Sequence, residues 1–396
     1  MTILCISSYE KGQDFLRECA ESGVRTILLT VEKLRDAAWP RDILAGLHVM
    51  PSLDVPEHAV NGVSYLARSE RIERIVALDE FDMELAALLR EHLRVSGLGV
   101  TATRAVRDKL VMRELAQGAG LLVPAFSGVV HHADIADYVQ RVPGPWVLKP
   151  RTQASAIGIR KLHDADELWP ILDSLGDMQS HHLLERYIPG DVYHVDGIVH
   201  GDEIQFAEVH RYAQPPFDVM HAGGIFCSRT VERGGEEDRV LRSELARLTR
   251  AVSLRDGVIH AEFIRARDTG AFHFLEIAAR VGGAHIADMV VAATGANLWR
   301  EWARLELALA RGERYTPPPL HRDYAGVIIS LARQEWPDMA AYDDPEIVWR
   351  LARRHHAGLV ARSEDVTRVE QLLESYMRRF NDDFHAALPA PERATD

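Results

Sequence analysis

The chain has 396 residues, of which 47% are hydrophobic and 27% are charged, as in an ordinary globular protein. This length is enough for two or three domains with a large hydrophobic core. A formal net charge of −13 argues against nucleic acid as the main partner, because binding a phosphate backbone needs a basic surface.

The cysteines and the N-terminal residues bear on where the protein works. Cys5, Cys19 and Cys227 are odd in number and lack metal-ligand spacing, which favours a reducing compartment. No secretion signal begins the sequence, and no apolar stretch approaches the length of a membrane span. We therefore expect a cytoplasmic protein without a membrane partner.

The first hundred residues alternate strand-length apolar runs with helix-length amphipathic segments. This alternation is typical of a parallel, doubly wound sheet. Asp79, Glu80 and Asp82 follow the last strand, where such sheets place ligands, although acidic residues there equally suit capping of the next helix. The expected strands are residues 2–7, 24–30 and 72–78, and the expected helices are residues 13–21, 59–68 and 83–93.

Strands dominate the middle of the chain, and helices return towards its end. Two polar loops stand out, a small-residue loop over 151–158 and a mobile loop over 214–230 that contains Pro and Gly pairs. The expected strands are 146–149, 159–162, 181–187, 192–199, 204–210, 260–264 and 272–280, and the expected helices are 104–116, 164–175, 236–254 and 297–310.

Two glutamates occupy the strands of a predicted hairpin around the turn 268–270. Glu262 and Glu276 would lie close together if they share a face of the paired strands, and two such carboxylates repel unless a cation separates them. Oxygen ligands of this kind suit Mg²⁺. Arg280 could grip an anion beside that metal. The alternative is a pair of solvent-facing glutamates on an edge hairpin.

Other charged residues stand near predicted strand and helix ends. Lys149 ends an apolar strand before the small-residue loop, as a phosphate contact would, although the loop could equally serve another interaction. Lys109 alone reads as a surface lysine. Glu185 could accept a purine amino hydrogen or belong to a surface pair with Arg186. His210 and Arg211 are second-tier candidates for substrate contact.

The order of these pieces resembles the ATP-grasp superfamily over residues 1 to about 315. Within it the chain looks most like the carboxylate–amine ligases, notably those that join L-amino acids. The strongest match is the segment from Glu276 to Gly283, and the second runs from Leu184 to Gly197. The implied fold is α/β, with an N-terminal parallel-sheet domain that precedes the ATP-grasp lobes, a small lid domain and a larger C-terminal lobe.

The resemblance also implies a division of the chain and a cofactor. ATP is expected with Mg²⁺, for which Mn²⁺ can substitute, and the substrates are a small carboxylate and an amine, both amino acids. It also allows a homodimer. The implied parts are an N-terminal α/β domain (1–100), a linker helix and lid lobe (101–185), a catalytic lobe (186–315), a C-terminal α/β subdomain (316–385) and a disordered tail (386–396).

Each matching position has an implied role. Lys109 and Lys149 contact the ATP phosphates, and Lys149 also serves catalysis beside the lid loop. Arg280 holds the substrate carboxylate or its acyl phosphate. The remaining positions are Glu185, Tyr187 and Ile188 for adenine, Asp191 for ribose, and Glu262 and Glu276 for the metal.

The sequence departs from the family pattern at three places. The phosphate loop is rich in Ala and Ser instead of Gly, and Asp191 replaces a more frequent Glu. Ala278 stands where a metal-binding Asn is common, which leaves the metal count open between one and two. Two other readings compete with the ligase, namely an ATP-grasp carboxylase that uses bicarbonate and a nucleotide-binding scaffold without turnover.

Overall fold

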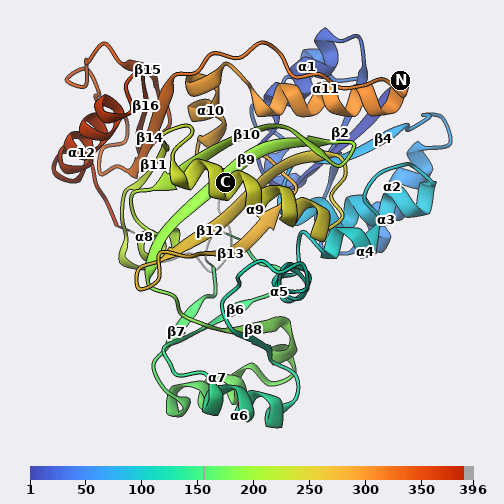
Figure 1. Cartoon of the computed structure of the whole chain (residues 1–396). Helices are drawn as coiled ribbons and strands as arrows, with labels where there is room; N and C mark the ends of the chain where they lie inside the picture. The colour runs from blue at the N-terminus through green and yellow to red at the C-terminus, as the bar shows by residue number, and fades with distance from the viewer. Residues whose placement is uncertain (155–156, 388–396) are drawn as a thin grey trace.

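The computed structural model describes residues 1–154 and 157–387, and it contains three sheets. A four-stranded sheet lies in the N-terminal part, an eight-stranded sheet forms the centre, and a second four-stranded sheet projects from the body as a small lobe (Figure 1). The expected α/β architecture, with a parallel N-terminal sheet and a small lid, is confirmed. Within these residues no helix has the length and hydropathy needed to cross a bilayer.

The N-terminal sheet is parallel, with the strand order β3-β2-β1-β4. Its first strand is buried throughout because helices cover both faces. Strand β3 was not predicted, because its residues are only half buried and carry no clear alternation. The elements are β1 (Thr2–Ser7), α1 (Gln13–Glu21), β2 (Arg25–Val31), β3 (Gly46–Met50), α2 (Pro56–Leu66), β4 (Arg74–Ala77) and α3 (Met83–Leu93).

A short linker joins this domain to the lid. The predicted helix over 104–116 is wrong as a single element, because α4 (Val100–Arg104) and α5 (Lys109–Gly118) are separate. Asp108 caps the second helix by accepting a hydrogen bond of 3.0 Å from the backbone N–H of Leu110. The capping geometry has an extended backbone, so the helix cannot run through it.

The lid sheet has the order β5-β8-β6-β7, and two helices pack on it around an apolar cluster that includes Trp146 and Leu168. Asp164 caps the second of these helices, as expected, by accepting a 3.1 Å hydrogen bond from the Glu167 N–H. The elements are β5 (Phe126–Gly128), α6 (His132–Arg141), β6 (Trp146–Pro150), β7 (Arg160–Leu162), α7 (Ala165–Leu175) and β8 (His182–Arg186). Residues 155–156 of the predicted loop lie outside the described residues.

The central sheet is antiparallel and has the order β13-β12-β9-β10-β11-β14-β16-β15. Its first strands are β9 (Gly190–His200), β10 (Glu203–Tyr212), β11 (Phe226–Thr230), β12 (Gly257–Ala266) and β13 (Phe272–Ala278). The loop expected over 214–230 is wrong, since that segment contains α8 (Pro216–Ala222) and β11. Helices α9 (Glu236–Ala251), α10 (Ile286–Thr294) and α11 (Leu298–Arg311) follow.

The C-terminal residues add to the same sheet. β14 (Tyr324–Leu331) pairs with β11 on one side and with β16 (His356–Ser363) on the other. β15 (Ile347–Arg350) forms the edge and α12 (Val366–Asp383) packs on this end of the sheet. The prolines at 317–319 therefore separate α11 from β14, but the strands after them belong to the same sheet. The domain limits stay predictions. Of the expected disordered tail, residues 388–396 lie outside the described part of the chain.

A buried ion pair joins the N-terminal sheet to the central body. The Arg74 guanidinium on β4 donates through Nε to the Glu306 carboxylate on α11 at 2.7 Å. The two residues are 232 positions apart, and both side chains are nearly buried. Arg74 also donates to the Ser96 carbonyl at 3.2 Å. Because a buried charge without its partner is costly, this pair fixes the N-terminal domain against α11.

We expect Glu306→Leu to lower the free energy of unfolding by about 3 kcal/mol, because it leaves the Arg74 guanidinium without its counter-charge. The double variant Arg74→Met/Glu306→Leu should recover most of that loss. Urea denaturation of these two variants and of Arg74→Met alone measures the coupling, with Glu70→Gln in the exposed Arg25–Glu70 pair as the control. Losses that simply add would show that the two side chains are energetically independent.

Candidate active site

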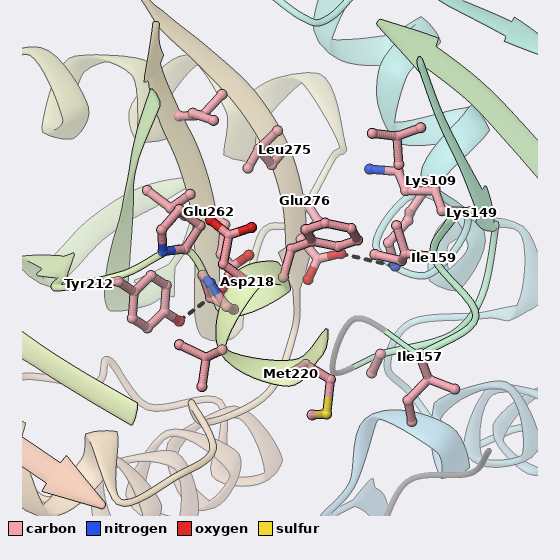
Figure 2. Close-up of a pocket in the computed structure, with 18 of the residues that line it drawn as sticks. Lys109, Lys149, Ile157, Ile159, Tyr212, Asp218, Met220, Glu262, Leu275 and Glu276 are labelled. Carbon is pink, nitrogen blue, oxygen red and sulfur yellow. Dashed lines mark hydrogen bonds and ion pairs between the residues drawn. The ribbon is translucent and has the colours of Figure 1, made fainter. Parts of the chain in front are cut away.

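A cavity of about 460 Å³ lies between the lid sheet and one face of the central sheet (Figure 2). Lid strands β6 and β8, central strands β12 and β13, and helix α8 all contribute to its walls. The cavity brings together residues that are far apart in the sequence. The predicted site residues that line it are Lys109, Lys149, Glu185, Tyr187, Ile188, Glu262, Glu276 and Arg280.

Asp191 is the one predicted site residue that does not line this cavity. Its neighbours Gly190 and Val192 do, but the Asp191 carboxylate pairs with Arg211 at 2.8 Å, and its side chain is 50% exposed. The structure gives Arg211 this surface pairing and buries His210 completely, outside the cavity lining. The two second-tier candidates thus stand apart from the cavity.

Glu262 and Glu276 occupy partnered positions on β12 and β13. Each carboxylate has its own partner, however. Glu276 Oε2 lies 2.9 Å from Lys109 Nζ, and Glu262 Oε1 accepts a 2.9 Å hydrogen bond from the Tyr212 hydroxyl. Lys109 therefore offsets the repulsion expected between the two carboxylates, and removal of Glu276 would take the counter-charge from Lys109.

His260 makes the second contact of the Glu262 carboxylate, with Nε2 lying 3.4 Å from Oε1. Burial would raise the pKa of Glu262, but hydrogen bonding and the charge of His260 outweigh it and lower that pKa. Glu262 is thus held as a carboxylate, which is the form that a divalent cation requires.

Glu185 on β8 is shared by two buried cations. Lys149 Nζ lies 2.5 Å from its Oε1, and Arg113 Nη2 lies 2.9 Å from its Oε2. Burial lowers the pKa of Lys149 to about 8, although the charge of Glu185 opposes the shift. Glu185 was expected to face an adenine amino group, but here both of its oxygens accept from protein cations.

Arg113 was missed in the sequence, and it is fully buried. It also donates to the Leu275 carbonyl on β13, so one guanidinium joins α5 to the lid and to the central sheet. A signal was present: Lys109 and Arg113 are four residues apart, which puts both on one helix face. Two cations on the buried face of an amphipathic helix point to a negatively charged partner.

Lys109 is the first residue of α5 and is buried, contrary to the surface position that it would have if read alone. Its Nζ donates to the Gln153 carbonyl at 2.6 Å, and its backbone N–H donates to the Arg151 carbonyl at 2.9 Å. The helix start is thereby fastened to the small-residue loop, of which Ala154 and Ile157 also line the cavity.

Arg280 is held by the N-terminal domain. Its Nε and Nη2 lie 3.0 and 2.9 Å from Glu80 Oε2, and Arg107 Nη1 lies 2.6 Å from Glu80 Oε1. Burial would raise the pKa of Glu80, but the two guanidiniums lower it to about 2. Asp79, in contrast, caps the helix that follows, accepting from the Phe81 N–H at 2.9 Å.

The strand expected over 272–280 is two residues too long, because β13 ends at Ala278. Arg280 therefore lies in the bend beyond the strand, where side chains do not alternate between faces as they do along a strand. Both residues still line the cavity. Helix α8 adds wall residues that the expected loop concealed, namely Phe217, Asp218, Val219 and Met220.

Known proteins resemble this chain in sequence and in fold. Residues 142–288 match the model of the ATP-grasp domain. The L-arginine-specific L-amino acid ligase of Bacillus subtilis is 24% identical over 255 residues, which cover 63% of this chain and 60% of that protein. The L-amino acid ligase from Bacillus licheniformis has a TM-score of 0.75 at 18% identity, with 99% of each chain covered.

A second solved structure, N5-carboxyaminoimidazole synthetase from Staphylococcus aureus complexed with ADP, has a TM-score of 0.71 at 15% identity. It covers 95% of this chain and 96% of its own. At such identities the solved structures establish the fold. Together with the domain match, they confirm the resemblance to ATP-grasp proteins, and the two L-amino acid ligases agree with the expected carboxylate–amine ligase branch. The chain spans about 60% of the B. subtilis ligase that it matches.

If Lys149 contacts a phosphate, binding of ADP should depend on pH. Its ammonium is lost as the pH rises through about 8, so affinity should be level below that pH and fall above it. A bound phosphate favours the charged form, and the fall should approach about tenfold per pH unit. Calorimetry between about pH 7 and 9.5 measures this, and Lys149→Gln should bind weakly without the inflection. A level affinity in the wild type would contradict the contact.

Proposed function

We propose that this chain, which carries an ATP-grasp domain, is an ATP-dependent ligase that joins a small carboxylic acid to an amine and releases ADP and phosphate. One observation carries the proposal: a single cavity holds two lysines, two cross-strand glutamates and an arginine. Cations for phosphate, carboxylates for a metal and a planar fork for a carboxylate are the groups that such a reaction needs.

The residues present fit Mg²⁺. Glu262 and Glu276 offer hard oxygen ligands from partnered strand positions, and both side chains line the cavity. When bound there, the ion would offset negative charge on the ATP phosphates. Mn²⁺ prefers similar ligands and would also fit. Ala278 offers no oxygen from its side chain, so the two glutamates are the protein ligands that we propose.

The reaction follows from the weakness of a carboxylate as an electrophile. The γ-phosphoryl group of ATP is transferred to the acid, which gives an acyl phosphate and ADP. The amine then attacks the acyl carbon, phosphate leaves with the bonding electrons of the C–O bond, and the nitrogen loses a proton. Lys109 and Lys149 would neutralise the nucleotide phosphates, while Arg280 would hold the acid or its acyl phosphate.

The adenine end of the nucleotide would lie against the lid. Tyr187 and Ile188 line the cavity next to Glu185, and their backbone groups could read the ring edge. Asp191 would reach the ribose only by leaving Arg211. The loop around residues 151–158 and helix α8 would exclude water, which would otherwise hydrolyse the acyl phosphate.

The B. subtilis relative is named as a ligase of L-amino acids. On that basis we propose amino acids as both substrates of this chain. A cytoplasmic location and a homodimer complete the proposal. To test it, the protein is incubated with ATP, Mg²⁺ and pairs of amino acids, phosphate release is followed, and products are identified by mass spectrometry. We expect ADP, phosphate and a dipeptide only when acid and amine are both present.

Bicarbonate is the control substrate in that assay, because the S. aureus neighbour is a carboxyaminoimidazole synthetase. ADP formation that needs bicarbonate and no amino acid would replace the ligase with a carboxylase. ADP binding without turnover on any pair would favour a nucleotide-binding protein that does not act as an enzyme.

Arg280→Lys separates a role in substrate activation from a role in nucleotide binding. Lysine keeps the charge but loses the fork, so the pairing with Glu80 and with a carboxylate would both weaken. We expect acid-dependent ADP release to fall by on the order of 100-fold and ADP affinity to change little. Arg265→Lys, on β12 and outside the cavity lining, is the control. Weak ADP binding with normal turnover would make Arg280 a nucleotide ligand.

A further inference from the structure

A chain of buried polar side chains runs through the central sheet behind Glu262. His194 and Asp196 lie two residues apart on β9 and so share a face of the sheet. His260 on β12 is the cross-strand partner of Asp196, and Glu262 is the partner of His194. His194 and Asp196 are fully buried, and His260 is 5% exposed.

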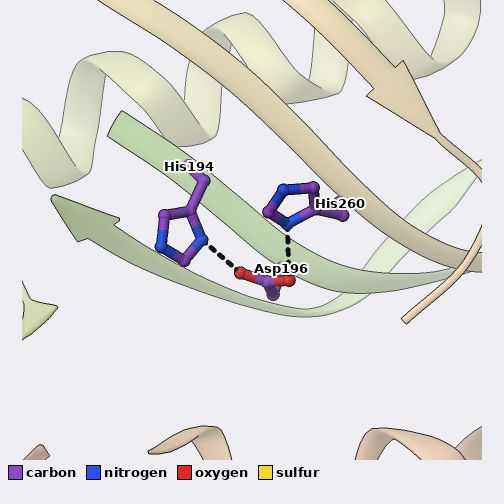
Figure 3. A group of neighbouring side chains, drawn as sticks. All are labelled: His194, Asp196 and His260. Carbon is purple, nitrogen blue, oxygen red and sulfur yellow. Dashed lines mark hydrogen bonds and ion pairs between the residues drawn. The ribbon is translucent and has the colours of Figure 1, made fainter. Parts of the chain in front are cut away.

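Contacts link these side chains in a row from Ser228 to Glu262, and Figure 3 shows the two contacts that Asp196 makes in the middle of it. Ser228 Oγ lies 2.7 Å from His194 Nε2, and His194 Nδ1 lies 2.6 Å from Asp196 Oδ2. The other carboxylate oxygen, Asp196 Oδ1, accepts from His260 Nδ1 at 3.0 Å. His260 Nε2 then reaches Glu262 Oε1 at 3.4 Å. This row of contacting polar side chains therefore begins in the core and ends on a carboxylate that lines the cavity.

His194, Asp196 and His260 are also residues that could ligate a metal. The distances argue for protons instead. Two ligands of one tetrahedral zinc ion lie ~3.3 Å apart, since each Zn–N or Zn–O bond is ~2.0 Å. The 2.6 Å between His194 Nδ1 and Asp196 Oδ2 is too short for that and lies just below the ~2.7–2.9 Å of a charge-assisted hydrogen bond. A carboxylate only accepts, so each ring nitrogen that faces Asp196 carries a hydrogen.

The cost of this arrangement suggests that it has a use. A carboxylate and two imidazoles in a sheet interior lose their hydration, and apolar side chains of similar size would pack there at lower cost. What the chain provides is orientation. Asp196 holds the His260 ring, and His260 and Tyr212 both contact Oε1 of Glu262. With both of these contacts on Oε1, Oε2 becomes the oxygen that can turn to a ligand in the cavity.

Gly282 packs directly on this chain. A Cβ at this position would lie 2.7 Å from Asp196 Oδ1 and 3.2 Å from His260 Nδ1. The next residue, Gly283, has open space at the same place, with nothing within 4 Å of a built Cβ. The backbone beyond β13 therefore leaves no room for the Asp196–His260 contact to shift towards it.

We propose that Asp196, acting through His260, is a positioning residue that fixes the Glu262 carboxylate for a divalent cation in the cavity. The inference rests on the proposed function, since it assigns a supporting contact to the metal site of that reaction. Hydrogen-bonded partners behind a metal ligand set its orientation, and their loss typically lowers metal affinity ~10–100-fold.

The test measures Mn²⁺ binding by electron paramagnetic resonance in the presence of saturating ADP, so that it does not depend on turnover. Asp196→Asn places an amide N–H against one of the two imidazole N–H groups and breaks the chain at its centre. We expect Mn²⁺ affinity to fall by at least ~10-fold and ADP affinity without metal to stay within ~2-fold. Glu262→Gln serves as the reference for loss of the ligand itself.

A matched glycine pair keeps the test valid if Asp196→Asn does not fold. Gly282→Ala pushes on Asp196 and His260, while Gly62→Ala adds the same methyl group on α2, outside the cavity lining and with nothing within 4 Å of it. We expect Gly282→Ala to weaken Mn²⁺ binding and Gly62→Ala to leave it unchanged, with circular dichroism showing both folded.

Each other outcome overturns the inference in a different way. If Glu262→Gln weakens Mn²⁺ binding but Asp196→Asn and Gly282→Ala do not, the positioning role fails and the metal site of the proposed function survives. If Glu262→Gln has no effect, the metal assignment fails and the positioning role with it. One equivalent of zinc that co-purifies with the wild type and is lost in Asp196→Asn would make the chain a second metal site.

Discussion

Pairing of buried charges is the constraint on which the cavity depends. Five Lys and Arg side chains meet Glu80, Glu185 and Glu276 here, and each of these three glutamates has at least one Lys or Arg nitrogen within 3 Å. Glu262 is held differently, by the Tyr212 hydroxyl at 2.9 Å and His260 at 3.4 Å. Glu185 neutralises Lys149 and Arg113, and Glu80 neutralises Arg107 and Arg280. Arg280–Glu80 joins the segment after β13 to the N-terminal domain. Arg113 joins α5 to Glu185 of the lid and to the Leu275 carbonyl of the central sheet, so these two arginines help to fix how the three parts sit together.

The need to pair buried charges also bears on which ligands the cavity can bind. In the proposed reaction, a nucleotide phosphate that binds Lys109 would take the counter-charge of Glu276, and a cation bound at the glutamate would replace it. Arg280 would share its guanidinium between Glu80 and the acid. Such a site would favour the metal–nucleotide complex over either component alone.

Sequence patterns were enough for the architecture, and together with the family resemblance they named eight residues that line the cavity. Alternating strands and helices identified the parallel sheet, and turn residues located the hairpin that carries Glu262 and Glu276. The patterns could not show partners. Nothing in the spacing places Glu80 beside Arg280, which are 200 residues apart, and α8 was hidden by prolines and glycines that usually mark loops. Asp191 kept its predicted place in the motif, yet its side chain pairs with Arg211 at the surface.

The central sheet has a consequence for how the chain is made. β11 receives its outer neighbour only from β14, and the Thr230 hydroxyl meets the Ala325 carbonyl across 95 residues of sequence. During vectorial synthesis the backbone groups along that side of β11 stay open until the last part of the chain has emerged. Until then β11 is an unpaired edge strand in the nascent chain. The C-terminal strands therefore protect the edge of β11. A truncated protein that ends at the proline run would leave this edge free to pair with a strand of another molecule.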